Sequence, residues 1–233
     1  RVRQRGGEPA ARCACHPAWG RSLLAEAAAE PSHPGAAGPR SAILGLNSVR
    51  HRLRPVGLMA IGLALSYAYF YQAGGWNQNS RFALVRSVLE EHTLRIDSYQ
   101  LHTGDRAFFR GHYYSDKAPG SSMLALLPAA IARGVGHLAG VDPGSFPGIA
   151  WTSYAATVST VGVATLAAAI LVAQLLRLWG YSTSAAIFAA TAYGLASPAW
   201  CYATLFMGHG LTAGCLMFAL ADRKSTRLNS SHT

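Results

Sequence analysis

The sequence has few charged residues, and its most apolar stretches have none. Only 13% of its 233 residues are Asp, Glu, Lys or Arg. Residues 149–176 and residues 184–220 contain no charged residue at all. Uncharged runs of this length are typical of helices that cross a lipid bilayer. The scarcity of charge therefore places the middle of the chain in the membrane class.

Acidic residues are scarce as well, and the resulting positive charge is concentrated at the ends of the chain. The formal net charge is +10. Residues 1–55 supply +6 of it, from nine arginines and three acids, and residues 222–233 supply +2, from three basic residues and one acid. The remaining 166 residues carry eight basic and six acidic side chains. Because the middle of the chain is nearly neutral, the net charge does not indicate a nucleic-acid partner.

The chain has only four cysteines, which argues against a disulfide-stapled fold. Cys13 and Cys15 precede His16, but no further ligands follow at the spacing of a zinc finger. Cys201 and Cys215 lie in apolar runs, as small core residues do. The sequence therefore calls for no metal and no cofactor.

Both ends of the chain have a composition unlike the middle. Residues 1–48 mix Gly, Ala, Arg, Pro and Glu without helical or strand periodicity, which predicts a disordered or spurious tail. Residues 222–233 resemble a translated sequencing adapter, so we expect an artefact there and a natural protein that continues beyond residue 221. The expected membrane domain therefore covers residues 49–221.

The apolar pattern predicts an all-α, polytopic bundle with four or five membrane spans. They cover about 55–72, 118–140, 149–176, 184–198 and 203–221. The last two are separated at Ser197-Pro198, because proline disfavours helix in the residue before it. Arg50, Arg52 and Arg54 precede the first span and favour a cytoplasmic N-terminal end. Arg133 lies too far into the second span to reach water directly, so it must snorkel or face protein.

Residues 74–117 form a polar stretch between the first two spans, which we expect to be a folded external loop. Asn79 or Ser80 can cap a helix over residues 81–91, with an apolar face around Phe82, Val85 and Leu89. Such a helix either lies flat on the bilayer or packs against the rest of the loop. Turn signals at Thr-Gly-Asp (103–105) and Arg-Gly-His (110–112) predict short strands or hairpins.

Two expected helix N-termini point into this loop, and basic residues accompany both. Arg81 stands in the first turn of the loop helix, and Lys117 precedes Pro119, which opens the second span. Helix N-termini expose unpaired N–H groups and a partial positive charge that favour phosphate. The loop therefore predicts a site for a lipid phosphate, unless the two cations only face bulk phospholipid.

Two short motifs at the ends of the loop carry a family resemblance. Arg81-Phe82-Ala83 and Asp116-Lys117-Ala118-Pro119 resemble the Arg-Tyr-Ala and acidic-Lys-Pro-Pro elements of multi-spanning glycosyltransferases that use lipid-linked sugars. That group, with the C-type glycosyltransferase fold, contains protein O-mannosyltransferases and lipid A aminoarabinose transferases. Ser197-Pro198 and Tyr202 are similar to a later part of the pattern, and the likeness covers residues 56–221.

The chain departs from the family in its carboxylates. Gln78 and Asn79 stand where the family has its first acidic pair, and Gly208-His209 stands where a later Asp would fall. Sugar transfer to a hydroxyl or amine needs a base, which an amide cannot supply. Of the loop acids, Asp116 and Asp97 are the better candidates. Each also has a structural alternative, a local salt bridge or a turn cap.

Four further polar residues are candidates for the site. His209 lies in an uncharged run, where it either binds phosphate, acts as a base or bonds to a neighbouring helix. Asn77, Gln78 and Asn79 can bind sugar hydroxyls, although capping explains one of the three.

The resemblance implies an inverting glycosyltransferase in the bacterial inner membrane. Its loop would face outside and take a sugar from a polyprenyl-phosphate donor to an unknown acceptor. Membrane lipid is the other expected partner, and nucleic acid is not expected. A transporter or flippase component and a non-catalytic lipid-binding member are the alternatives. A transporter predicts internal repeat symmetry, which we do not find in the sequence.

Overall fold

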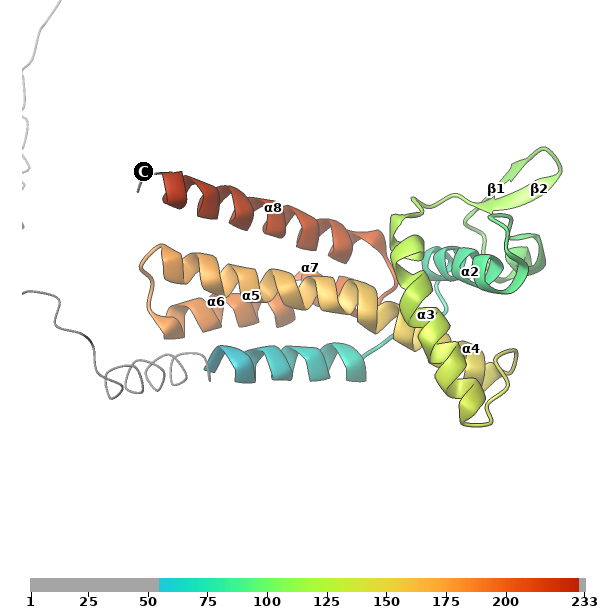
Figure 1. The fold of residues 1–233 in the computed structure, drawn as a ribbon, viewed down its shortest axis with the longest axis horizontal. Coiled ribbons are helices and arrows are strands. Elements are labelled where there is room, and N and C mark those ends of the chain that lie inside the picture. Colours follow the sequence, from blue (N-terminus) through green and yellow to red (C-terminus); the bar gives the residue numbers. More distant parts are fainter. Residues whose placement is uncertain (1–54, 231–233) are drawn as a thin grey trace, which may run out of the picture. The chain divides into compact units, whose positions relative to one another are not determined.

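The computed structural model describes residues 55–230, and within this range the chain is mostly helical (Figure 1). A two-stranded sheet is the minor part of the described fold. The expected tail at 1–48 and the arginines at 50, 52 and 54 lie outside the described residues. The prediction of a predominantly α-helical protein is confirmed for the described residues, with the small sheet as an addition.

One helix in the described range is long and apolar enough to cross a bilayer. It runs from Phe146 to Leu178, as α4 (Phe146–Thr157), a π-helical segment η2 (Val158–Gly162) and α5 (Val163–Leu178). Its 33 residues extend about 50 Å at 1.5 Å per residue, which exceeds the ~30 Å of hydrocarbon. It contains the expected span at 149–176. The helices Pro55–Tyr69 and α6 (Thr183–Leu195) are apolar but shorter.

The chain breaks between α6 and α7 (Pro198–Thr204) where the proline predicts it. Pro198 takes the first position of α7, where its missing N–H costs nothing. The Ser197 hydroxyl accepts from the Ala199 amide at 3.1 Å and caps the helix. After a second break, α8 covers Gly208–Ser230, so residues 222–230 of the expected adapter artefact continue this helix.

Glycines let the long helices approach closely. A β-carbon at Gly194 of α6 would lie 2.8 Å from the Leu63 side chain and 2.9 Å from the Tyr67 hydroxyl. That hydroxyl donates to the Gly194 carbonyl at 3.1 Å. A β-carbon at Gly214 of α8 would lie 2.9 Å from the Ala164 carbonyl of α5. At these two glycines a larger residue would collide with the neighbouring helix.

The loop helix α2 begins five residues earlier than expected. It covers Trp76–Glu91, with Gly75 at its N-cap. The cap predicted at Asn79 or Ser80 is wrong, because the Gln78 side chain reaches back to the Gly75 amide at 2.7 Å and supports an earlier start. Ser80 is buried instead, and its hydroxyl shares a hydrogen bond with the Ser115 hydroxyl at 2.7 Å.

Both sides of α2 are covered by protein. Val85 is fully buried in a cluster with Ala125 and Ala129 of α3 (Gly120–Leu138). Leu84 packs with Ile96 and Tyr99 of the loop in a second cluster. Of the two expected arrangements, the helix packed against the rest of the loop is the one observed.

The rest of the loop contains a hairpin, as the turn signals predict, and a short 3-10 helix that the sequence did not predict. The 3-10 helix η1 covers Asp97–His102, and β1 (Arg106–Phe109) pairs antiparallel with β2 (His112–Ser115). Arg110 and Gly111 join the strands with φ of 51° and 84°. Positive φ at both central residues gives the turn whose twist matches the strands.

The helix α3 starts after Pro119, as expected, and packs against α2 and α4. Arg133 faces protein rather than water. Its Nη1 atom lies 2.7 Å from Oε1 of Glu90 at the end of α2. This ion pair joins the loop helix to the helix that follows the loop.

Candidate functional site

A cavity of about 520 Å³ lies where α2 meets the first turns of α3 and α8. One wall is Arg81 of α2, and the others include Ser121 of α3 and His209 of α8. These residues are up to 128 positions apart in the chain. Two of the residues predicted to hold phosphate, Arg81 and His209, therefore line the same cavity.

Arg81 is the buried cation of this cavity, with 7% of its surface exposed. Its Nε atom donates to the Asn77 side-chain oxygen at 3.0 Å. Its Nη1 atom donates to the Ala118 carbonyl at 3.0 Å and to the Ser121 hydroxyl at 2.7 Å. These acceptors are all neutral, so they orient the guanidinium without cancelling its charge.

No carboxylate among residues 55–230 forms an ion pair with Arg81. Burial lowers the pKa of Arg81, and the negative charge of Asp116 opposes that effect. The Nη2 atom faces the start of α8, 3.5 Å from where a β-carbon at Gly208 would lie. A buried guanidinium held by neutral groups is costly without an anion beside it. The arrangement favours a negatively charged ligand at this position.

The first turns of α3 and α8 add to this preference. Gly120 and Ser121 begin α3, Gly208 and His209 begin α8, and all four line the cavity. The first N–H groups of a helix have no partner within it, and the helix dipole is positive at this end. His209 was expected deep within a span, but it stands exposed at the start of α8, with its ring stacked on Tyr202 at 4.5 Å.

Lys117 lies between two carboxylates instead of lining this cavity. Its Nζ atom is 3.0 Å from Asp105 and 3.3 Å from Asp116. The hydrogen bond to Asp105, followed by that to Asp116, raises the pKa of Lys117. The Thr-Gly-Asp pattern predicts only a turn at Asp105, and nothing in it indicates the approach of Asp105 to Lys117. The lysine is therefore available to hold Asp116 in place.

Asp97 fastens the loop to its own hairpin. Its carboxylate accepts from the Tyr113 amide at 2.7 Å and lies 2.8 Å from Nδ1 of His112. The Tyr113 hydrogen bond, and then that of His112, lowers the pKa of Asp97. Neither Asp97 nor Asp116 is among the described residues that line the Arg81 cavity. Asp97 therefore has a structural role, but its partners are residues of strand β2, 15 and 16 positions away, and not a local turn.

The three amides predicted to bind sugar all have partners within the protein. Asn77 holds Arg81, and Gln78 caps α2. Asn79 donates to the His102 carbonyl at 2.8 Å. Of the three, Asn77 contacts the cavity's cation directly, whereas Asn79 lies on the other side of α2.

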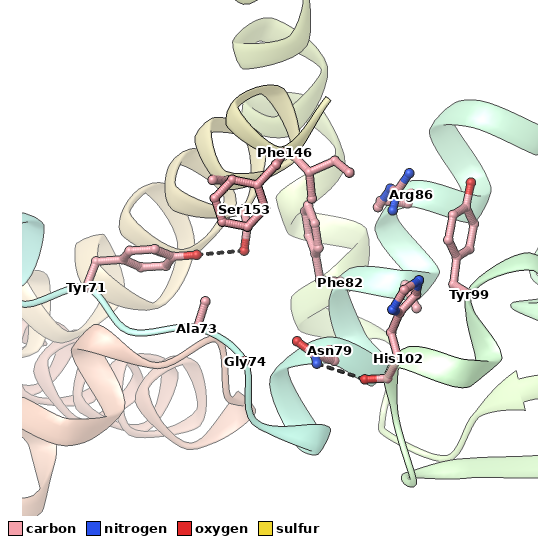
Figure 2. Close-up of a pocket in the computed structure, with 13 residues that line it drawn as sticks. Tyr71, Ala73, Gly74, Asn79, Phe82, Arg86, Tyr99, His102, Phe146 and Ser153 are labelled. Carbon is pink, nitrogen blue, oxygen red and sulfur yellow. Dashed lines mark hydrogen bonds between the residues drawn. The ribbon is translucent and has the colours of Figure 1, made fainter. Parts of the chain in front are cut away.

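A second cavity, of about 530 Å³, lies on that other side of α2 (Figure 2). Its walls come from residues 71–74, α2, η1 and α4. Phe82 and Phe146 make much of its apolar lining, and Arg86, Tyr99 and His102 lie at one side. The sequence does not predict this cavity, because its lining residues have no regular spacing in the chain.

Comparisons with models of known families, with curated proteins and with solved structures found no match to this chain.

Proposed function

We propose that this protein is a membrane glycosyltransferase that takes a sugar from a polyprenyl-phosphate donor. Arg81 and the first turns of α3 and α8 hold the donor phosphate in the 520 Å³ cavity. The bundle spans the bacterial inner membrane four or five times, with the loop outside. The buried guanidinium of Arg81, held by neutral acceptors beside the cavity, is the single observation that carries this proposal.

The chemistry requires stabilisation of the departing phosphate. When the acceptor oxygen or nitrogen attacks the anomeric carbon, the bond from that carbon to the phosphate oxygen breaks, and its electron pair stays on the lipid phosphate. Donors already positioned for this charge, such as Arg81, need no rearrangement during the reaction. Such stabilisation is commonly the largest catalytic contribution.

Asp116 takes the acceptor proton in this proposal. It is the carboxylate whose charge acts on Arg81, and Lys117 holds it at 3.3 Å. A general base has to lie within hydrogen-bond reach of the proton that it removes. Asp97 is the weaker candidate, since both its oxygens are engaged by the hairpin.

A non-catalytic lipid-binding protein is the second candidate. Gln78 and Asn79, at the positions of the family's acidic pair, form hydrogen bonds within the protein. A protein of this kind would bind the lipid phosphate through Arg81 but would transfer no sugar.

Release of polyprenyl phosphate from a polyprenyl-phosphate sugar distinguishes the two candidates. The purified protein in bilayers, the Asp116→Asn variant and the Asp97→Asn variant are compared. Asp142→Asn is the matched control, because the Asp142 side chain accepts from Gly144 in an exposed turn and an amide oxygen keeps that bond. We expect loss of transfer of about 10²–10⁴-fold in Asp116→Asn alone. Full activity in that variant would remove Asp116 as the base.

A further inference from the structure

The cavity on the far side of α2 is built from a different set of elements than the Arg81 cavity. Residues 71–74 follow the apolar helix Pro55–Tyr69, and α4 is the beginning of the 33-residue apolar helix. Both apolar helices therefore have one end at this cavity. In a bilayer, the ends of such helices lie where lipid head groups meet the upper part of the acyl chains.

The lining is divided into an apolar part and a polar part. Phe82, Phe146, Ile149 and Ala150 contribute apolar surface from α2 and α4. Figure 2 shows Phe82 and Phe146 between a Tyr71–Ser153 pair on one side and Arg86, Tyr99 and His102 on the other. An apolar pocket with a few convergent polar groups is the usual form of a small-molecule site.

The Tyr71–Ser153 pair adds no charge to the cavity. The Tyr71 hydroxyl donates to the Ser153 hydroxyl oxygen at 2.8 Å, so each satisfies part of the other's hydrogen-bonding needs. This side of the cavity can therefore accommodate the hydrocarbon chain of a ligand. The recognition of a charged head belongs to the opposite side.

Arg86 is the charged side chain among the described residues on that opposite side. Arg86 binds both oxygens of Glu90, at 2.9 Å and 3.1 Å, and Arg133 binds one of them at 2.7 Å. The Tyr99 hydroxyl donates to the same carboxylate at 2.9 Å. Two guanidinium groups thus share one carboxylate, so Glu90 balances only one of them, and of these groups Arg86 and Tyr99 line the cavity itself. The cavity is complementary to a ligand with an apolar body and an anionic head.

We propose that this cavity binds one anionic phospholipid of the surrounding bilayer. An acyl chain lies along Phe82, Phe146 and Ala150, and the phosphate lies beside Arg86 and His102. The exposure of Phe146, at 84%, leaves the apolar entrance open. The lipid site depends on the membrane placement of the protein but not on sugar transfer.

The two cavities are separate, because Arg81 and Arg86 point to different sides of α2. Residues five positions apart on a helix differ by about 140° in direction. A ligand in one cavity is therefore distinct from a ligand in the other. A lipid between α2 and α4 would hold the loop helix against the membrane helix while the Arg81 cavity stays free.

Native mass spectrometry of the purified protein tests this site with two lipids of identical acyl chains, phosphatidylglycerol and phosphatidylcholine. The wild-type protein is expected to retain one phosphatidylglycerol at least tenfold better than phosphatidylcholine. Ala150→Trp fills the cavity and is expected to weaken this retention at least tenfold. Ala107→Trp, on the exposed hairpin strand, is the matched control and keeps it. Equal retention of the two lipids by the wild type, or undiminished retention in Ala150→Trp, overturns the proposal.

A measurement on the wild-type protein covers the case in which Ala150→Trp does not fold. Phosphatidylglycerol with a photoreactive group in its acyl chain is cross-linked in bilayers, and the labelled peptides are identified. Labelling within Phe146–Thr157 and α2 supports the site, and labelling confined to other segments overturns it. Polyprenyl-phosphate binding in Ala150→Trp should stay at the wild-type level. If the wild-type protein does not bind polyprenyl phosphate at all, the proposed function is contradicted, but the lipid site is not.

Discussion

The side chain of Arg81 lies against Gly208, so that a β-carbon at position 208 would be 3.5 Å from the guanidinium Nη2 atom. The contact joins the loop helix α2 to the first turn of α8 across 127 positions of sequence. Because position 208 has no side chain, the guanidinium and the N-terminus of α8 face the same space. This relationship defines the cavity to which we assign the donor phosphate.

A larger residue at position 208 is expected to occupy that space. Gly208→Leu should weaken polyprenyl-phosphate binding at least tenfold, because its side chain competes with the ligand for the cavity. Binding is measured by titration in detergent micelles. Gly134→Leu is the matched control, since a β-carbon there meets nothing within 4 Å. If both variants bind like the wild type, the phosphate lies elsewhere.

The variant Lys117→Gln tests whether Lys117 binds the donor phosphate or positions Asp116. The lysine is bound by Asp105 and Asp116, so its removal should leave polyprenyl-phosphate binding within about twofold of wild type. Sugar transfer should fall at least tenfold, because Asp116 loses the group that holds it. Binding and transfer are measured on the same preparation. A loss of phosphate binding in Lys117→Gln would return the lysine to the role that the sequence predicted for it.

The Glu90 network makes the fold sensitive to acid. Burial alone would raise the pKa of Glu90, but hydrogen bonds from Arg86 and Tyr99 and the charges of Arg86 and Arg133 lower it below its ordinary 4.5. The unfolded chain therefore binds this proton more readily than the folded protein. The stabilisation is fully present above pH 4.5 and is lost as the pH falls through the lower folded-state pKa.

Glu90→Gln is expected to remove this pH dependence and to cost about 1–2 kcal/mol at neutral pH. Thermal unfolding at pH 7 and at successively lower pH measures both effects. An exposed acid of the same helix, Glu91, provides the control variant Glu91→Gln. An unchanged acid transition in Glu90→Gln would show that the network does not stabilise the folded state.

Close packing of α6 against the first apolar helix gives a prediction about stability alone. Gly194→Ala places a methyl group 2.8–3.0 Å from Leu63 and Tyr67 atoms, and we expect it to cost about 1–3 kcal/mol. Gly57→Ala, where a β-carbon meets nothing within 4 Å, should be neutral or stabilising. Thermal unfolding in detergent compares the two. Equal melting temperatures for both variants would argue against the observed helix contact.

Much of the fold follows from local sequence rules. Pro198 dictates the break between α6 and α7, and Gly111 supplies one of the two positive φ angles that the hairpin turn needs. The start of α2 was wrongly predicted, because Gln78 caps the helix from within and Ser80 is used in a long-range hydrogen bond. The Gly75–Gln78 contact is local and has the capping-box spacing, so it could have been predicted, whereas no local rule includes the Ser80–Ser115 hydrogen bond across 35 positions.

The candidate site was predictable only in part. Arg81 and His209 were chosen for their charge and position, and they line one cavity. The partners of Lys117 could not be predicted, because Asp105 reaches it through the folding of the hairpin. The cavity beside Arg86 depends on the approach of α4 to α2, which no residue spacing encodes.

Recognition of the donor phosphate by Arg81 is tested most directly by comparing polyprenyl phosphate with the uncharged polyprenol. Wild type and Arg81→Gln are titrated with both, and Arg110→Gln at the hairpin tip controls for the loss of one positive charge. We expect wild type and Arg110→Gln to prefer the phosphate at least tenfold, and Arg81→Gln to lose about 10–100-fold in affinity for it alone. Equal affinity of the wild type for phosphate and alcohol, or an unchanged preference in Arg81→Gln, would contradict the assignment.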